Sequence, residues 1–104
     1  MAVVSMMRVS GDPDELAEKV KQHIAPVGRE LGPQHGGIGN IVCRAADGLL
    51  IINLWENEQG RHDMAQEPRI QEAVQAANFP APAFEGYEVL WMTILPEAVR
   101  DAAS

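Results

Sequence analysis

Apolar and β-branched residues gather in four stretches of the chain, and each stretch predicts a strand. The stretches span residues 2–10, 38–46, 49–57 and 86–95. Between them, apolar residues recur at helical spacing, as Leu16, Val20, Ile24, Val27 and Leu31 and then as Ile70, Ala73, Val74 and Ala77. The order strand, helix, strand, strand, helix, strand predicts an α+β fold of the ferredoxin-like βαββαβ type. In that fold a four-stranded antiparallel sheet carries its helices on one side.

Local signals mark where the helices begin and end. Asp12 is a good helix cap, and Pro13 after it suits the first helical position. Pro26 predicts a kink or a break in the first helical region, because proline removes a helical hydrogen bond. The second helical region is predicted to be a short helix over residues 58–66 and a further helix that starts at Pro68.

The dipeptide Asp47-Gly48 predicts a two-residue hairpin turn that places Ala46 opposite Leu49. Because side chains alternate along a strand, this register sorts the hairpin into two faces. One face is uniformly apolar and collects Ile41, Cys43, Leu50, Ile52 and Leu54. The other face mixes apolar and polar groups and collects Asn40, Val42, Arg44, Ile51, Asn53 and Trp55. We expect the apolar face to lie against the helices, and the mixed face to line a cavity or an interface.

The last strand is expected to add Val89 and Trp91 to the mixed face by the same alternation. A sheet face that exposes two tryptophans and several aliphatic side chains is unusual for a monomer. Two copies paired face to face about a two-fold axis would cover it. The chain is therefore predicted to be a homodimer whose sheets close into an α/β barrel, with a pocket between the copies.

Composition narrows the classes of partner. At 104 residues, with 46% hydrophobic residues, the chain is expected to be one domain over residues 1–96 with a short tail at 97–104. Eight basic and 15 acidic residues give a net charge of −7, which argues against nucleic acid and against an anionic membrane surface as partners. No apolar run approaches the length of a membrane span, and one cysteine suits a reducing compartment, so we expect a cytoplasmic protein.

Three segments resemble the dimeric α/β-barrel superfamily, and within it the antibiotic-biosynthesis-monooxygenase-like branch. They are LLIINLWEN at 49–57, EQGRHDMAQEP at 58–68 and GYEVLWMTI at 86–94, and the resemblance extends over about residues 2–95. It implies the fold described above, a homodimer, and a pocket for a small aromatic or polyketide-like molecule. The superfamily includes cofactor-free monooxygenases, quinol oxygenases, haem-degrading enzymes, isomerases and cyclases, so the fold leaves the activity open.

Asn53 and Trp55 are the first candidates for a site, because they lie two apart on one strand and point the same way. Trp55 would form an aromatic wall for a flat substrate, with Trp91 beside it. Asn53 would donate a hydrogen bond to a substrate carbonyl or oxyanion. Asn40 and Arg44 share this face and are expected to contact the substrate. The alternative is that these residues form a dimer core, with Arg44 paired to an acidic residue of the other subunit.

His62 is the candidate catalytic base. It follows Trp55 by seven residues, near the expected start of a helix, and a helix N-terminus favours a neutral imidazole. The alternative is a surface or capping histidine. Of the other candidates, His23 is expected to be solvated, His35 to lie in a glycine-rich loop, and Cys43 to be a buried structural thiol.

Several chemistries lack support in the sequence. The histidines and the cysteine show no metal-ligand spacing, and no metal or other cofactor is expected. Haem-degrading relatives carry an asparagine on the first strand and a histidine on the second helix; residues 2–10 contain no asparagine, and His62 comes early in its helix.

The resemblance therefore favours a homodimeric, cofactor-independent monooxygenase, an oxidoreductase that acts on a phenolic or polyketide-type substrate through Asn53 and His62. The alternatives are an isomerase or cyclase that uses the same pocket, and a non-catalytic binding or structural dimer.

Overall fold

The computed structural model describes residues 1–93, so the expected end of the last strand and the expected tail at 97–104 lie outside the described residues. The elements are β1 (Val3–Ser10), α1 (Pro13–Lys19), a π-helical turn (Val20–Ile24), α2 (Ala25–Leu31), a 3-10 turn (Gly32–His35), β2 (Gly37–Ala45), β3 (Gly48–Trp55), α3 (Glu58–Ala65), α4 (Pro68–Ala77) and β4 (Ala83–Glu88).

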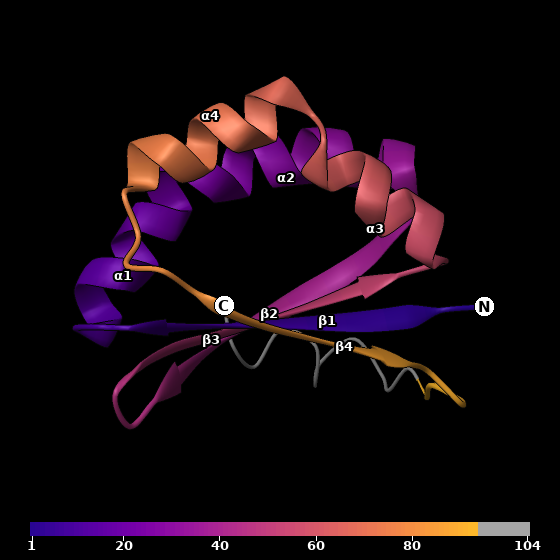
Figure 1. Cartoon of the computed structure of the whole chain (residues 1–104), viewed down its shortest axis with the longest axis horizontal. Coiled ribbons are helices and arrows are strands. Elements are labelled where there is room, and N and C mark those ends of the chain that lie inside the picture. The colour runs from indigo at the N-terminus through magenta and orange to yellow at the C-terminus, as the bar shows by residue number, and fades with distance from the viewer. Residues whose placement is uncertain (94–104) are drawn as a thin grey trace.

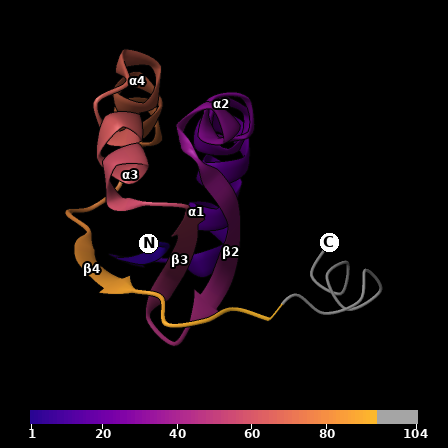
Figure 2. The ribbon, with the colours of Figure 1, turned by 90° about the vertical axis from the view of Figure 1, so that its right-hand side faces the viewer.

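The four strands form one antiparallel sheet in the order β2-β3-β1-β4, and the helices form a single layer over one of its faces (Figure 1). The view in Figure 2 shows α2 and α4 side by side above the sheet, and no helix of the described residues lies on the opposite sheet face. The predicted ferredoxin-like βαββαβ fold is confirmed.

The first helical region begins and bends where the sequence predicts. The Asp12 carboxylate accepts hydrogen bonds from the backbone N–H groups of Asp14 (2.9 Å) and Glu15 (3.3 Å). Before Pro26, the chain passes through the π-helical turn over Val20–Ile24, and Pro26 then lies in the first turn of α2. A wider turn of this kind lets the helix continue past a residue that cannot donate a backbone hydrogen bond.

The predicted register of the hairpin is wrong by two residues. The turn consists of Ala46 and Asp47, and Ala45 lies opposite Gly48. Gly48 belongs to β3, where it pairs with Ala45 and Ser10, and a Cβ atom there would overlap the backbone carbonyl of Val9 on β1. Its glycine is thus required by a close approach of two strands and not by the turn. Because the shift is two residues, each side chain keeps the face on which it was placed.

The assignment of the two sheet faces is also wrong, and it is reversed. Leu49 and Ile51 are 3% and 5% exposed and pack with Val9 against Leu16 and Val20 of the first helical region. Ile51, and with it Asn53 and Trp55, therefore faces the helices. The helix-facing side of the sheet is apolar near the hairpin, where α1 covers it, and becomes more polar toward Trp55. The prediction treated this side as one mixed surface and so did not separate its apolar end from its polar end.

The helix-free face carries the apolar set of the hairpin, and toward β4 it also carries the Arg8–Glu85 ion pair. Cys43, predicted to be buried beneath the helices, lies on this face and is half-buried. We call this surface the open face; its apolar members are Val4, Met6, Ile41, Cys43, Leu50, Ile52 and Leu54.

The last strand is shorter than predicted. β4 ends at Glu88, although one further hydrogen bond joins the Val89 N–H to the carbonyl of Ala2 at 2.9 Å. The alternation expected for Val89 and Trp91 does not apply, because they follow the strand; Trp91 is 81% exposed. Among residues 1–93, no helix is long and apolar enough to cross a membrane.

Candidate functional site

A line of polar and small residues crosses the sheet on the side that faces the helices. Asn53 on β3 lies between Asn40 on β2 and Ser5 on β1, and Ser5 in turn lies opposite Gly86 on β4. Directly opposite residues of neighbouring strands have Cβ atoms about 4.5–5.5 Å apart, so these side chains are within reach of one another. We call these four residues the inner polar row.

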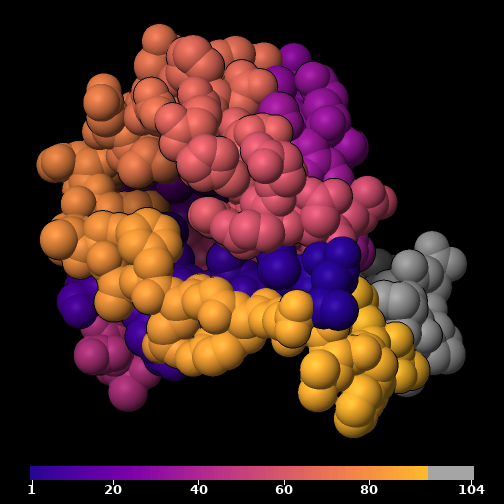
Figure 3. Space-filling view, turned by 45° about the vertical axis from the view of Figure 1, so that its right-hand side comes forward, coloured from indigo at the N-terminus to yellow at the C-terminus, as the bar shows by residue number. Residues whose placement is uncertain are grey.

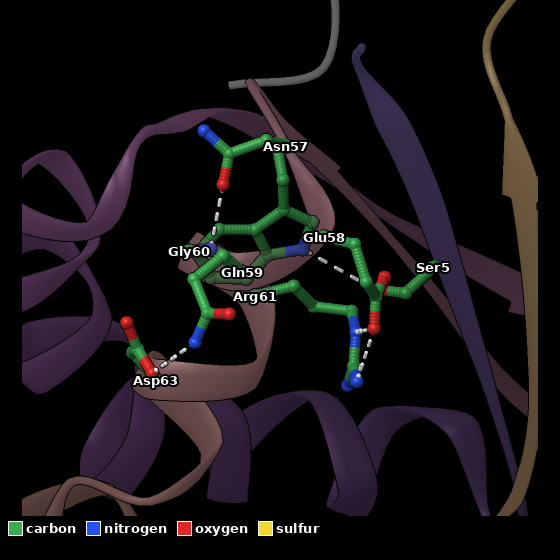
Figure 4. A network of polar contacts seen from close by, with 8 residues as sticks. Ser5, Asn57, Glu58, Gln59, Gly60, Arg61 and Asp63 are labelled. Atoms are coloured by element: carbon green, nitrogen blue, oxygen red, sulfur yellow. Dashed lines mark hydrogen bonds and ion pairs between the residues drawn. The ribbon is translucent and has the colours of Figure 1, made fainter.

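Larger side chains border the inner polar row on both sides along the strands. Trp55 and Val3 lie on the side toward α3, and the Trp55 indole N–H donates a 3.4 Å hydrogen bond to the hydroxyl of Ser5 (Figure 4). On the other side lie Val42, Ile51, Met7 and Phe84. The row is thus a polar strip between an indole and an apolar patch.

The side-chain amide of Asn53 has no hydrogen-bond partner within residues 1–93, although the residue is half-buried. That part of the chain contains no buried side-chain nitrogen or oxygen without a partner, so the Asn53 amide must be reached by solvent. An amide in this position offers one donor group and one acceptor group to a ligand.

A hollow opens between the helix layer and the β4 edge of the sheet. Figure 3 shows it between the α3–α4 surface and β4, with atoms of β1 visible above β4. Two pockets lie elsewhere. A cavity of about 280 Å³ at the hairpin end is bordered by Val9, Leu49 and Ala81, and one of about 370 Å³ lies between His35 and Asn57. Neither is lined by Asn53 or Trp55.

Helix α3 follows β3 along the chain and forms one end of the helix layer (Figure 1), and Figure 4 shows the polar contacts of its first turns. Asn57 caps it, and its side-chain oxygen accepts a 2.7 Å hydrogen bond from the Gly60 N–H. Arg61 pairs with Glu58 at 2.6 Å; their hydrogen bond raises the pKa of Arg61 and lowers the pKa of Glu58. Arg61 lies one turn before the buried Met64 and is half-buried, so the inner side of α3 carries a cation.

His62 was expected near the start of a helix, and the structure does not place it there. His62 is an exposed residue in the last turn of α3, not at its N-terminus, because the helix ends at Ala65. The role of His62 as a base therefore stays a hypothesis without support from its helix.

The other predicted residues are distributed around the molecule. Asn40 joins Asn53 in the inner polar row but is exposed at the sheet edge. Arg44 pairs with Asp14 of its own chain at 2.6 Å. Trp91 is exposed beyond β4, away from the row. His35 bonds Glu67 at 2.8 Å in a half-buried pair.

His23 was expected to be solvated but is half-buried. Among residues 1–93, no three histidine, cysteine or acidic side chains come together in a way that could hold a metal ion. The sequence interpretation missed Ser5 and Gly86, which only strand pairing brings beside Asn53. The polar serine within an otherwise apolar first strand was the available signal.

Comparison with known proteins extends this description. No family profile and no curated protein matches the chain. Solved structures do match. A protein from Deinococcus radiodurans that bears the provisional name antibiotic biosynthesis monooxygenase shares 18% identity over 90% of this chain and 98% of its own, with a TM-score of 0.66.

Two further structures have the same fold. SnoaB, a cofactor-independent oxygenase from Streptomyces nogalater, is 17% identical over 92% of this chain and 96% of its own, with a TM-score of 0.62. A dimeric protein of unknown function from Bacteroides fragilis is 12% identical over 85% of this chain and 96% of its own, with a TM-score of 0.66. The predicted resemblance is confirmed in the fold, which these identities establish and nothing more.

Proposed function

We propose that the hollow between the helix layer and β4 reaches the inner polar row and binds a flat aromatic small molecule, and that the chain is a cofactor-independent monooxygenase for a phenolic or polyketide-type substrate. Two facts support the proposal: the fold is shared with SnoaB, an oxygenase of that kind, and a solvent-reached amide stands beside an indole in the sheet. Polar groups placed in an otherwise apolar concavity are typical of small-molecule sites.

The observation that carries the proposal is the free amide of Asn53. Because solvent reaches this amide and no protein group within residues 1–93 occupies it, a ligand oxygen can take the place of solvent water there. In the proposed site the Asn53 N–H donates to the phenolate or enolate oxygen of the substrate, and Trp55 packs against the ring. Such a donor stabilises the substrate anion, whose electrons are transferred to dioxygen.

The proposed reaction balances with dioxygen as the oxidant. A ring methylene activated by a neighbouring carbonyl loses a proton, the carbanion adds dioxygen, and the O–O bond then breaks. One oxygen atom remains in a new carbonyl group and the other leaves as water, so that R₂CH₂ and O₂ give R₂CO and H₂O. The proton is first taken by His62 or by solvent, since the groups of the inner polar row do not titrate near neutral pH.

Oxygen uptake with dithranol, a phenolic three-ring anthrone, tests this function. Uptake is measured in buffer with a chelator and without flavin, against the rate without protein. We expect catalysed uptake, and a decrease of about 10²-fold or more in Asn53→Ala, within the range for loss of one oxyanion donor. Gln75→Ala, which removes an exposed amide from α4, is the control and should keep the full rate. Equal rates for wild type and Asn53→Ala would contradict the proposal.

A non-catalytic binding protein, or an isomerase or cyclase, is the second candidate. It is favoured by one observation: the inner polar row supplies two amides and a hydroxyl but no base. Ligand binding that depends on Asn53, without oxygen uptake, would support this candidate. His62→Gln separates the cases further, because it lowers uptake only if His62 removes the proton.

The proposed assembly is a homodimer formed through the open face, in the reducing cytoplasm that suits a single cysteine. The open face carries seven apolar side chains, with the Arg8–Glu85 ion pair toward β4, and no helix of residues 1–93 covers it. The sequence predicted a dimer through the mixed face; the structure turns that face toward the helices and leaves the apolar one to be covered.

A further inference from the structure

Gly86 is the one member of the inner polar row without a side chain. It lies in the middle of β4, opposite Ser5, on the side that faces the helices. β4 is an edge strand and borders the hollow in Figure 3. The next residues on the same face of β4 are Phe84 and Glu88, both exposed, so Gly86 makes a gap between two larger side chains.

The fold itself does not require glycine at this position. A Cβ atom on Gly86 would meet only the carbonyl oxygen of Val4, at 3.9 Å, which is an ordinary contact. Its backbone is also outside the left-handed region, unlike Gly11 and Gly36. Glycine weakens a strand, and in a strand it often marks a place where a ligand approaches closely. A glycine that packing does not demand is thus better explained by access to the hollow.

We propose that Gly86 lines the entrance of the binding site, and that an elongated, flat, fused-ring molecule passes over it to reach Asn53. This inference rests on the function proposed above. Strands lie about 4.8 Å apart, so the two steps from β4 to β3 place Asn53 about 10 Å inward from Gly86. A fused-ring quinone can place a polar end at Asn53 while it still crosses β4, whereas a single ring cannot span that distance. Gly86 would therefore determine ligand size.

Side chains of increasing size at Gly86 test this role. Gly86→Ala and Gly86→Leu are compared with wild type by equilibrium dialysis against alizarin, a hydroxylated three-ring quinone, and catechol, a single ring. We expect Gly86→Leu to weaken alizarin binding at least ten-fold and Gly86→Ala to weaken it less, while catechol binding changes less than two-fold. Glu85→Leu, which adds the same side chain next to Gly86 on the opposite face, should leave alizarin binding within two-fold of wild type.

Thermal unfolding separates this role from a general loss of structure. Gly86→Leu should melt no lower than wild type, because leucine favours a strand more than glycine does. Alizarin binding by Gly86→Leu at wild-type strength, or an equal loss for alizarin and catechol, would overturn the inference and leave the proposed function standing. If wild type binds neither probe, the proposed site fails and the inference with it. If Gly86→Leu does not fold, the test is the alizarin affinity of Gly86→Ala, which should be lower than that of wild type; an unchanged affinity would overturn the inference.

Discussion

Arg44 and Asp14 join β2 to α1 through an ion pair of 2.6 Å. The hydrogen bond from Arg44, with its charge, lowers the pKa of Asp14 below the usual 3.8. Because the folded-state pKa is the lower one, the pair stabilises the fold above pH 3.8, and this contribution is lost as the pH falls through the lowered pKa. Both side chains are exposed, so the effect is expected to be small.

Arg44→Gln should therefore lower the urea midpoint of unfolding at neutral pH, and the difference from wild type should disappear as the pH drops below 3.8. Urea titrations at a series of pH values measure this. Arg29→Gln is the control, since Arg29 forms no ion pair within the described residues. A difference that persists unchanged in acid would mean that Arg44 acts through packing of its stem and not through its charge.

At the scale of elements, α3 and the 3-10 turn before β2 are in unusually close contact. A Cβ atom on Gly60 would overlap the backbone carbonyl of His35, so Gly60→Ala must push α3 away from the turn. Overpacking of this kind typically costs about 1–3 kcal/mol, more than the roughly 1 kcal/mol that alanine gains over glycine in a helix. We expect a net loss in the free energy of unfolding, measured with denaturant.

Gly28→Ala on α2 is the matched control for Gly60→Ala. Nothing lies within 4 Å of a Cβ atom at Gly28, so the same substitution should stabilise the protein there by up to about 1 kcal/mol. Equal and favourable effects at both glycines would show that α3 has room to move and would contradict the close contact.

The helices and strands also show how much of the fold could be predicted from the sequence. Helix spacing, the Asp12 cap and a helix irregularity close to Pro26 depend on local geometry, so they were predictable. The faces of the sheet were not, because the helix side changes from Ile51 to Asn53 within two residues. The site depends on strand pairing: Asn53 and Trp55 were found on one strand, but their partners Ser5 and Gly86 come from strands about 50 and 30 residues away in the chain, and no local pattern links them.

At the scale of the whole molecule, the open face is the surface through which we propose that two copies pair. Ile41 and Val42 are neighbours on β2 with similar exposure, 50% and 41%, but Ile41 points to the open face and Val42 to the helix side. A two-fold symmetric dimer through the open face would bury the Ile41 side chain of each copy. An ammonium group placed there would be desolvated in both copies. Ile41→Lys should therefore weaken the dimer at least ten-fold.

Val42→Lys is the matched control, because lysine is well tolerated on an edge strand and this side chain would remain in water. Light scattering over a series of micromolar concentrations gives both dissociation constants. Because the proposed dimer contact at Ile41 and the proposed ligand site lie on opposite sides of the sheet, Ile41→Lys should still bind alizarin. A monomeric wild type would remove the proposed dimer, and equal dissociation by both lysines would place the contact at the β2 edge instead of the open face.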